Sequence, residues 1–119
     1  MKHELKLDAD SPLKALRIAH KLSAHESLFP DAQQRRSSSG KGWHFRVKSF
    51  KTGARKNIKY RQLLGDCWGR LRADKIRLKL NQPTNVLFEW KNGKQAGNWH
   101  KLNIIEILAD LKFAACDAM

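Results

Sequence analysis

An alternation of apolar and polar residues in Trp43-His44-Phe45-Arg46-Val47-Lys48 is the strongest constraint on what this chain can fold into. Successive side chains of a β-strand point to opposite faces, so the segment predicts a strand with three large apolar side chains on one face. Arg46 and Lys48 then project together from the opposite face. Such a strand belongs to a sheet whose apolar face is covered by a second layer.

The rest of the chain shows short strand and helix patterns. In the first half of the chain we expect a strand over 3–8, a helix from Asp10-Ser11-Pro12 to Leu28-Phe29, and a strand over 58–61 that forms a hairpin with 43–48. In the second half we expect a helix over 60–71, strands over 75–80 and 86–90, a turn at Asn92-Gly93 and a helix over 102–115. Continued helix is a competing interpretation for 75–80. Residues 31–42 lack apolar periodicity and predict a mobile loop. The order predicts an α+β fold, with short antiparallel strands in hairpins packed against about three helices.

The length of 119 residues fits a single basic domain that spans 1–119. A hydrophobic content of 41%, with four Trp and five Phe, excludes a disordered tail and suffices for one modest core. Because that core is small, a homodimer is compatible with the sequence, although nothing requires it.

The N-terminal segment is not expected to be a targeting signal, and the chain is not expected to span a membrane. Met1-Lys2-His3-Glu4-Leu5 lacks the apolar run of a signal peptide, and no apolar stretch approaches the roughly 20 residues of a membrane span. Cys67 and Cys116 lie among apolar residues and are expected to be buried free thiols, which suits a reducing compartment. We expect a soluble, cytoplasmic protein with no membrane partner.

The charge balance is the main functional clue. Lys and Arg number 24 against 11 acidic residues, which gives a net charge of +13. Self-repulsion at that level lowers folding stability and favours a neutralising polyanion as partner. Nucleic acid is the commonest one, and neutralising its phosphates drives binding through counterion release. An anionic membrane surface and a merely solvated basic surface are the competing interpretations.

Basic residues concentrate around the 43–48 strand. No acidic residue lies between Asp31 and Asp66, whereas ten of the 24 basic residues do. Arginine binds phosphate through two parallel hydrogen bonds and lysine as a point charge, so the hairpin is predicted to grip a phosphate backbone. The predicted nucleic-acid-binding residues are Arg35, Arg36, Lys41, Trp43, Arg46, Lys48, Lys51, Arg55, Lys56, Lys59 and Arg61. The Ser37–Gly42 run is a weaker phosphate-binding candidate.

Aromatic residues offer a second kind of contact. Trp43 and His44 open the basic strand and can stack on an unpaired base, although Trp43 is in phase with the core residues Phe45 and Val47. Trp99 follows a Gly-Asn turn and is the better candidate for an exposed aromatic.

Catalytic signatures are missing from the sequence. There is no zinc-ligand spacing, nucleophile motif, carboxylate cluster or dinucleotide fingerprint, so we expect no metal, no cofactor and no enzyme activity. One enzymatic hypothesis remains, a small ribonuclease that uses His44 with Arg46 or His100 with Lys101.

The sequence is therefore compatible with three functions. The leading hypothesis is a non-enzymatic accessory protein that binds DNA or RNA, or a complex containing either, through the 35–61 segment. The alternative is an interaction protein of a phage or mobile element, which would act as an inhibitor or adaptor of a CRISPR-type ribonucleoprotein or other nucleic-acid machinery. The ribonuclease toxin is the third.

Overall fold

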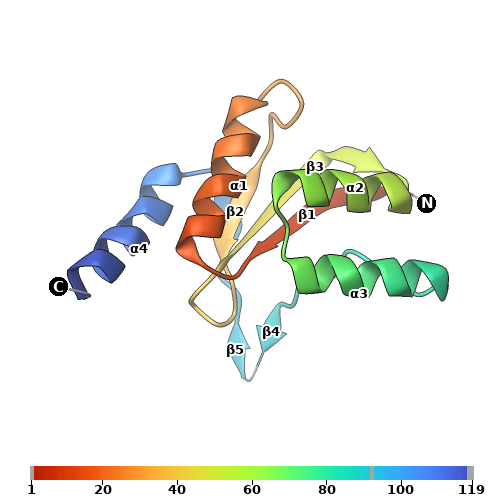
Figure 1. The fold of residues 1–119 in the computed structure, drawn as a ribbon. Helices are drawn as coiled ribbons and strands as arrows, with labels where there is room; N and C mark the ends of the chain where they lie inside the picture. Colours follow the sequence, from red (N-terminus) through yellow and green to blue (C-terminus); the bar gives the residue numbers. More distant parts are fainter. Residues whose placement is uncertain (1, 92, 118–119) are drawn as a thin grey trace.

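The structure, a computed structural model, describes residues 2–91 and 93–117, with side chains up to Leu111. Within that part of the chain it contains a four-stranded antiparallel sheet, a two-stranded hairpin and four helices (Figure 1). The α+β class predicted from the sequence is confirmed.

The central sheet has the strand order β1-β3-β2-β6, formed by β1 (His3–Ala9), β3 (Trp43–Thr52), β2 (Gln33–Arg36) and β6 (His100–Lys101). In the long β1–β3 pairing, Leu7 lies opposite Phe45 and Ala9 lies opposite Trp43. These side chains are buried in the core on one face of the sheet, as the alternation predicted.

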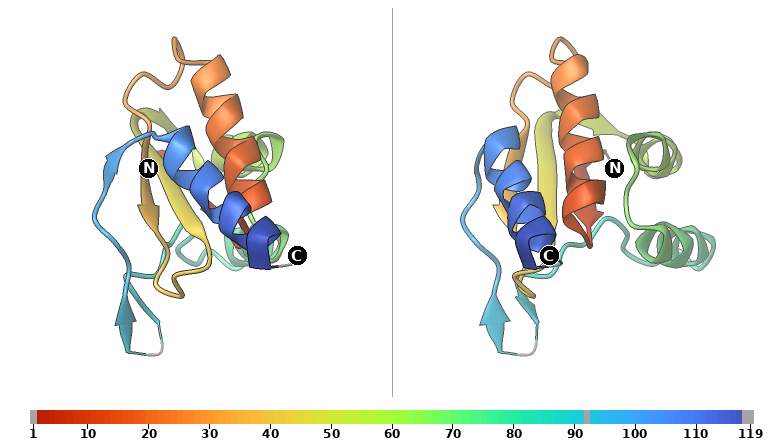
Figure 2. Two further views of the ribbon diagram at one scale, coloured as in Figure 1. Left: turned by 90° about the vertical axis from the view of Figure 1, so that its left-hand side faces the viewer. Right: turned by 60° about the vertical axis from the view of Figure 1, so that its left-hand side comes forward.

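Two helices cover the apolar face of this sheet. They are α1 (Pro12–Ala24) and α4 (Ile104–Asp117), which lie side by side in Figure 2. The start of α1 is as predicted, because the Ser11 hydroxyl accepts a hydrogen bond from the Lys14 amide and Pro12 occupies the first turn. The helix ends at Ala24, short of the predicted 28–29, and Phe29 folds back into the core.

The other two helices, α2 (Ala54–Leu64) and α3 (Trp68–Lys79), form an antiparallel pair beside the free edge of β1 (Figure 1). Gly65 ends α2 in the left-handed region, at φ 94°, and so allows the chain to reverse within a few residues. The pair also closes the strand edge. The Asp8 amide donates to the Asp66 carboxylate at 2.7 Å, and Arg70 donates to the Lys6 carbonyl at 2.7 Å. An unpaired edge would otherwise invite pairing with another chain.

The helix pair corrects three predictions. Residues 58–61 belong to α2, so the expected hairpin with a basic loop does not form. The helix predicted over 60–71 is broken at Gly65, which shifts the helical phase and leaves Trp68 71% exposed. Leu63, in the last turn of α2, is 70% exposed on the outer side of that helix. Residues 75–79 continue α3, as the competing interpretation held, because the inward positions Leu71 and Asp74 follow helical rather than alternating spacing.

Further differences lie in the loops. Residues 33–36 form β2 within the interval predicted to be irregular, because its backbone completes the ladder with β3. Of the strand predicted over 86–90, only Trp90 is included, in β4 (Trp90–Lys91), which pairs with β5 (Lys94–Gln95). The predicted turn at 92–93 falls partly outside the described residues, since Asn92 is not described. The helix predicted over 102–115 is α4. Cys67 is half-buried rather than buried, and the Cys116 side chain lies outside the described part.

Candidate nucleic-acid interface

A buried charge network joins α2 to α3. Arg61 is fully buried; its Nε donates to Asp66 at 2.8 Å and its Nη1 donates to Asp74 at 2.7 Å. Arg70 donates to Asp66 at 2.6 Å and Arg77 donates to Asp74 at 3.0 Å. Each buried carboxylate therefore has two guanidinium partners, as charges removed from water require.

The pKa of Asp74 reflects this environment. Burial alone would raise it, but hydrogen bonds from the Asn85 backbone amide, Arg61 and Arg77 hold the pKa below its usual value. Asp74 is thus a carboxylate at neutral pH, and its charge is neutralised inside the protein by Arg61 and Arg77.

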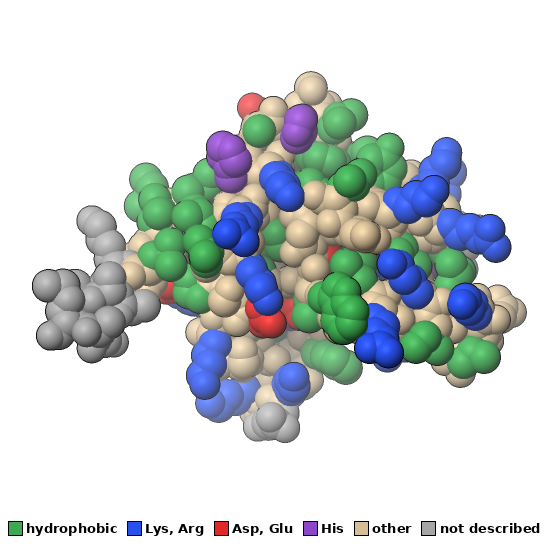
Figure 3. Space-filling view, viewed as in Figure 1, with side chains coloured by type: hydrophobic (Ala, Val, Ile, Leu, Met, Phe, Trp, Pro, Cys, Tyr) green, Lys and Arg blue, Asp and Glu red, His purple; other side chains and the backbone are tan. Residues whose placement is uncertain are grey.

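The outer side of the helix pair is left strongly positive. Residues 53–80 contain nine Lys and Arg against two acids, Asp66 and Asp74, and both acids are buried. Three of the nine, Arg61, Arg70 and Arg77, bind those acids. The other six are exposed and have no ion pair among the described residues: Arg55, Lys56, Lys59, Arg72, Lys75 and Lys79. We call these six the α2–α3 basic face, and Figure 3 shows Lys and Arg side chains gathered over both helices.

The eleven residues predicted from the sequence do not share one surface. Lys41 lies in the β2–β3 turn, whereas Arg55, Lys56 and Lys59 lie on α2, past the far end of β3 (Figure 1). A ten-residue strand separates these two ends, which is about 30 Å at the usual rise per residue. Lys48 and Lys51 are exposed along β3 between them.

Three of the eleven lie inside the protein. Arg61 belongs to the buried network. Trp43 is fully buried and donates its Nε1 hydrogen to Asp110 at 3.0 Å, as its phase with the core residues favoured. Arg35 is 2% exposed and donates to His44 and to Glu89, at 3.0 and 2.7 Å. Such side chains hold the fold and are not available to a partner in this structure, so we leave them out of the proposed interface.

Two more predicted arginines are occupied by their own chain. Arg36 binds Asp110 through both terminal nitrogens and lies over the Trp43 ring, 4.1 Å from its centroid. Arg46 donates to Gln33 at 2.7 Å and lies 4.4 Å from the centroid of Trp99. Trp99, predicted to be exposed, is half-buried against Arg46 and Arg35. The polar face of the sheet is therefore largely satisfied from within.

His44 illustrates this closure. Its Nδ1 accepts the Arg35 hydrogen bond, and its Nε2 lies 3.7 Å from the Asp8 carboxylate. Burial, with the nearby positive charge of Arg35, lowers the pKa of His44 to about 4. A neutral imidazole with both nitrogens directed at its own chain gives no support to its proposed role as a ribonuclease base.

Half of the α2–α3 basic face was not predicted from the sequence. Arg72, Lys75 and Lys79 lie on α3, where a strand was predicted from Lys75 onward. The signal that could have indicated them is composition, because the excess of basic over acidic residues continues beyond the predicted 35–61 segment to residue 80.

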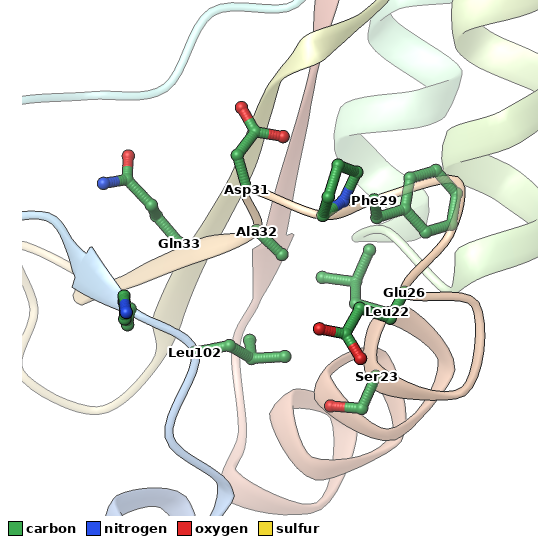
Figure 4. Close-up of a pocket in the computed structure, with 10 residues that line it drawn as sticks. Leu22, Ser23, Glu26, Phe29, Asp31, Ala32, Gln33 and Leu102 are labelled. Carbon is green, nitrogen blue, oxygen red and sulfur yellow. The ribbon is translucent and has the colours of Figure 1, made fainter.

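One hollow elsewhere has different chemistry. It measures about 550 Å³ and lies between the end of α1 and the β2–β6 edge. Figure 4 shows the apolar side chains of Leu22 and Leu102 around it, together with the carboxylate of Glu26. A second carboxylate, Asp31, is held by Ser49. These acids make the hollow unsuitable for a phosphate.

Comparisons with known proteins give no further guide. The chain matches no family model, and no curated protein or solved structure is significantly similar to it. In the described part of the chain, no three His, Cys, Asp or Glu side chains are grouped to hold a metal ion. None of the described helices is long and apolar enough to cross a membrane.

Proposed function

We propose that this protein binds the phosphate backbone of nucleic acid through the α2–α3 basic face, without acting on it chemically. The observation that carries the proposal is the separation of charge across the helix pair. Both acids face inward and are neutralised by arginines, whereas six cations face outward without acidic partners. An outer surface that carries one sign of charge fits a polyanion.

The fold supports such a surface in a second way. Arg61, Asp66 and Asp74 hold α2 against α3, and Asp66 with Arg70 fixes both to β1. The cations therefore project from two helices that are held rigidly to the sheet. Rigid presentation lowers the entropy lost on binding, because only the long side chains must be ordered.

Charge reversal on the exposed face tests the proposal. In Arg55→Glu/Lys59→Glu, fluorescence anisotropy at moderate salt should show a loss of affinity for labelled DNA and RNA of at least tenfold. The matched control is Lys14→Glu/Arg17→Glu, which makes the same charge change on the exposed side of α1. The control should bind nearly as well as the wild type.

Two other results would count against the proposal. Equal losses in both double variants would mean that only net charge matters, and would overturn the assignment to this face. Absence of binding by the wild-type protein to any nucleic acid at moderate salt would overturn direct recognition, and would favour an adaptor that docks on a protein component.

A further inference from the structure

A groove runs between α2 and α3 within the basic face. It measures about 400 Å³ and is lined by Arg55, Ile58, Lys59, Lys75, Leu78 and Lys79. The two helices contribute the same pattern: a cation, an aliphatic residue three positions later and a second cation four positions later. In α2 these are Arg55, Ile58 and Lys59, and in α3 they are Lys75, Leu78 and Lys79. Side chains at these spacings share one face of a helix.

The antiparallel arrangement brings the two patterns face to face. Ile58 is buried and Leu78 is half-buried, so the aliphatic side chains form the floor of the groove. The four cations stand around this floor, and no acid lines the groove. Like charges crowded around this floor lower stability unless a ligand neutralises them, which favours an anionic ligand. The aliphatic floor favours a ligand that also offers an apolar surface.

Exposed apolar side chains continue from this groove toward the turn at Gly65 that joins the two helices. Tyr60 and Leu63 line a smaller hollow with Lys56 and Lys59 on α2. On α3, Trp68 is largely exposed, and the Arg72 guanidinium lies over its ring, 5.4 Å from the centroid. Both helices thus carry exposed apolar or aromatic side chains beside the cations of the basic face.

We infer that the α2–α3 basic face selects single-stranded nucleic acid over duplex, an inference that rests on the proposed function. A duplex presents phosphates and sugars outward and keeps its bases stacked inside, so it would leave the aliphatic floor and Trp68 without partners. A single strand brings phosphates to the cations and unstacked bases to the apolar side chains. DNA and RNA strands share this chemistry.

The test compares labelled oligonucleotides of equal charge as single strands and as duplexes, each in DNA and RNA. We expect tighter binding of single strands. Trp68→Ala should weaken single-strand binding by roughly five- to a hundredfold, the range found for loss of one base–aromatic stack, and should leave duplex binding nearly unchanged. Trp90→Ala is the matched control, because Trp90 is also exposed but lies on β4, outside the face.

The aliphatic floor is tested separately with Leu78→Ser, which keeps all four cations. It should weaken single-strand binding and spare the duplex. Equal affinity for both forms, unchanged by Trp68→Ala and Leu78→Ser but lost in Arg55→Glu/Lys59→Glu, would overturn this inference and leave the proposed function standing. Binding of an acidic polyglutamate peptide but of no nucleic acid would overturn both.

Discussion

Replacement of Arg61 by Met gives the sharpest test of how the helix pair is held. Arg61 is fully buried and makes three hydrogen bonds, to Asp66, Asp74 and Asn57. Breaking a buried ion pair by removing one partner costs about 3–5 kcal/mol. The lower end applies here for two reasons. Asp66 keeps Arg70 and Asp74 keeps Arg77, and the Nη2 of Arg61 is itself buried without a hydrogen bond, so removing it relieves a penalty.

We therefore expect Arg61→Met to lower the free energy of unfolding by about 3 kcal/mol. For a chain of this length, that corresponds to a fall in Tm of roughly 10–15 °C. The assay is urea denaturation followed by tryptophan fluorescence, with thermal melts beside it. Arg55→Met, on the exposed side of the same helix, is the control and should not lower the midpoint, because it removes one of the crowded cations of the groove.

The two variants should also separate stability from binding. Arg61→Met should lose much stability but little nucleic-acid affinity at a temperature where it is folded, whereas Arg55→Met should lose affinity without losing stability. A stability loss below about 1 kcal/mol in Arg61→Met, the level of an exposed ion pair, would refute the account of a buried network.

Other predictions concern His44 and Gly65. The folded-state pKa of His44 is about 4, below the ordinary 6.5, so the unfolded chain takes up a proton first as pH falls and His44 lowers stability between pH 6.5 and 4. At pH 4.5 the loss of stability amounts to about 2–3 kcal/mol. His44→Gln should remove this loss when urea midpoints are compared at pH 7.0 and 4.5. An equal loss in the variant and the wild type would contradict the prediction. Gly65→Ala should lower stability by about 1 kcal/mol or more, because φ is 94° there, and a midpoint equal to or above that of the wild type would show that the α2–α3 reversal does not need glycine.

The parts of the fold that could be predicted are those fixed by local chemistry. The alternation in 43–48 needs only the geometry of a strand, and the start of α1 needs only a capping serine before a proline. Both are present in the structure.

The errors have two sources: a glycine inside a predicted helix, and contacts with residues far along the chain. Tyr60, Leu63, Leu64, Cys67, Trp68 and Leu71 show continuous helical spacing, but Gly65 interrupts the helix and turns Trp68 outward. Residues 33–36 carry no strand pattern, because the inward position Gln34 is polar. Gln34 can be buried only because its side-chain amide forms hydrogen bonds with the backbone of Asn103, far along the chain.

The basic residues of the candidate site were indicated by the sequence, but their arrangement was not. The sequence predicted Arg55 and Lys56 in a hairpin loop and Lys59 in a returning strand, whereas all three are exposed on α2. It could not show that Arg35 and Arg61 are buried, because an arginine becomes internal only when carboxylates from other elements meet it. For the same reason the outward charge of α3 became visible only once Asp66 and Asp74 were seen to face inward.

The salt dependence of binding tests the central claim most directly. If the six cations of the basic face each neutralise one phosphate, the logarithm of the association constant should fall with the logarithm of salt concentration at a slope of roughly −4 on a single strand. Arg55→Glu/Lys59→Glu should make that slope shallower by about 1.4, which is two contacts. A slope near zero for the wild type, or one that the double variant leaves unchanged, would contradict phosphate binding by the α2–α3 basic face.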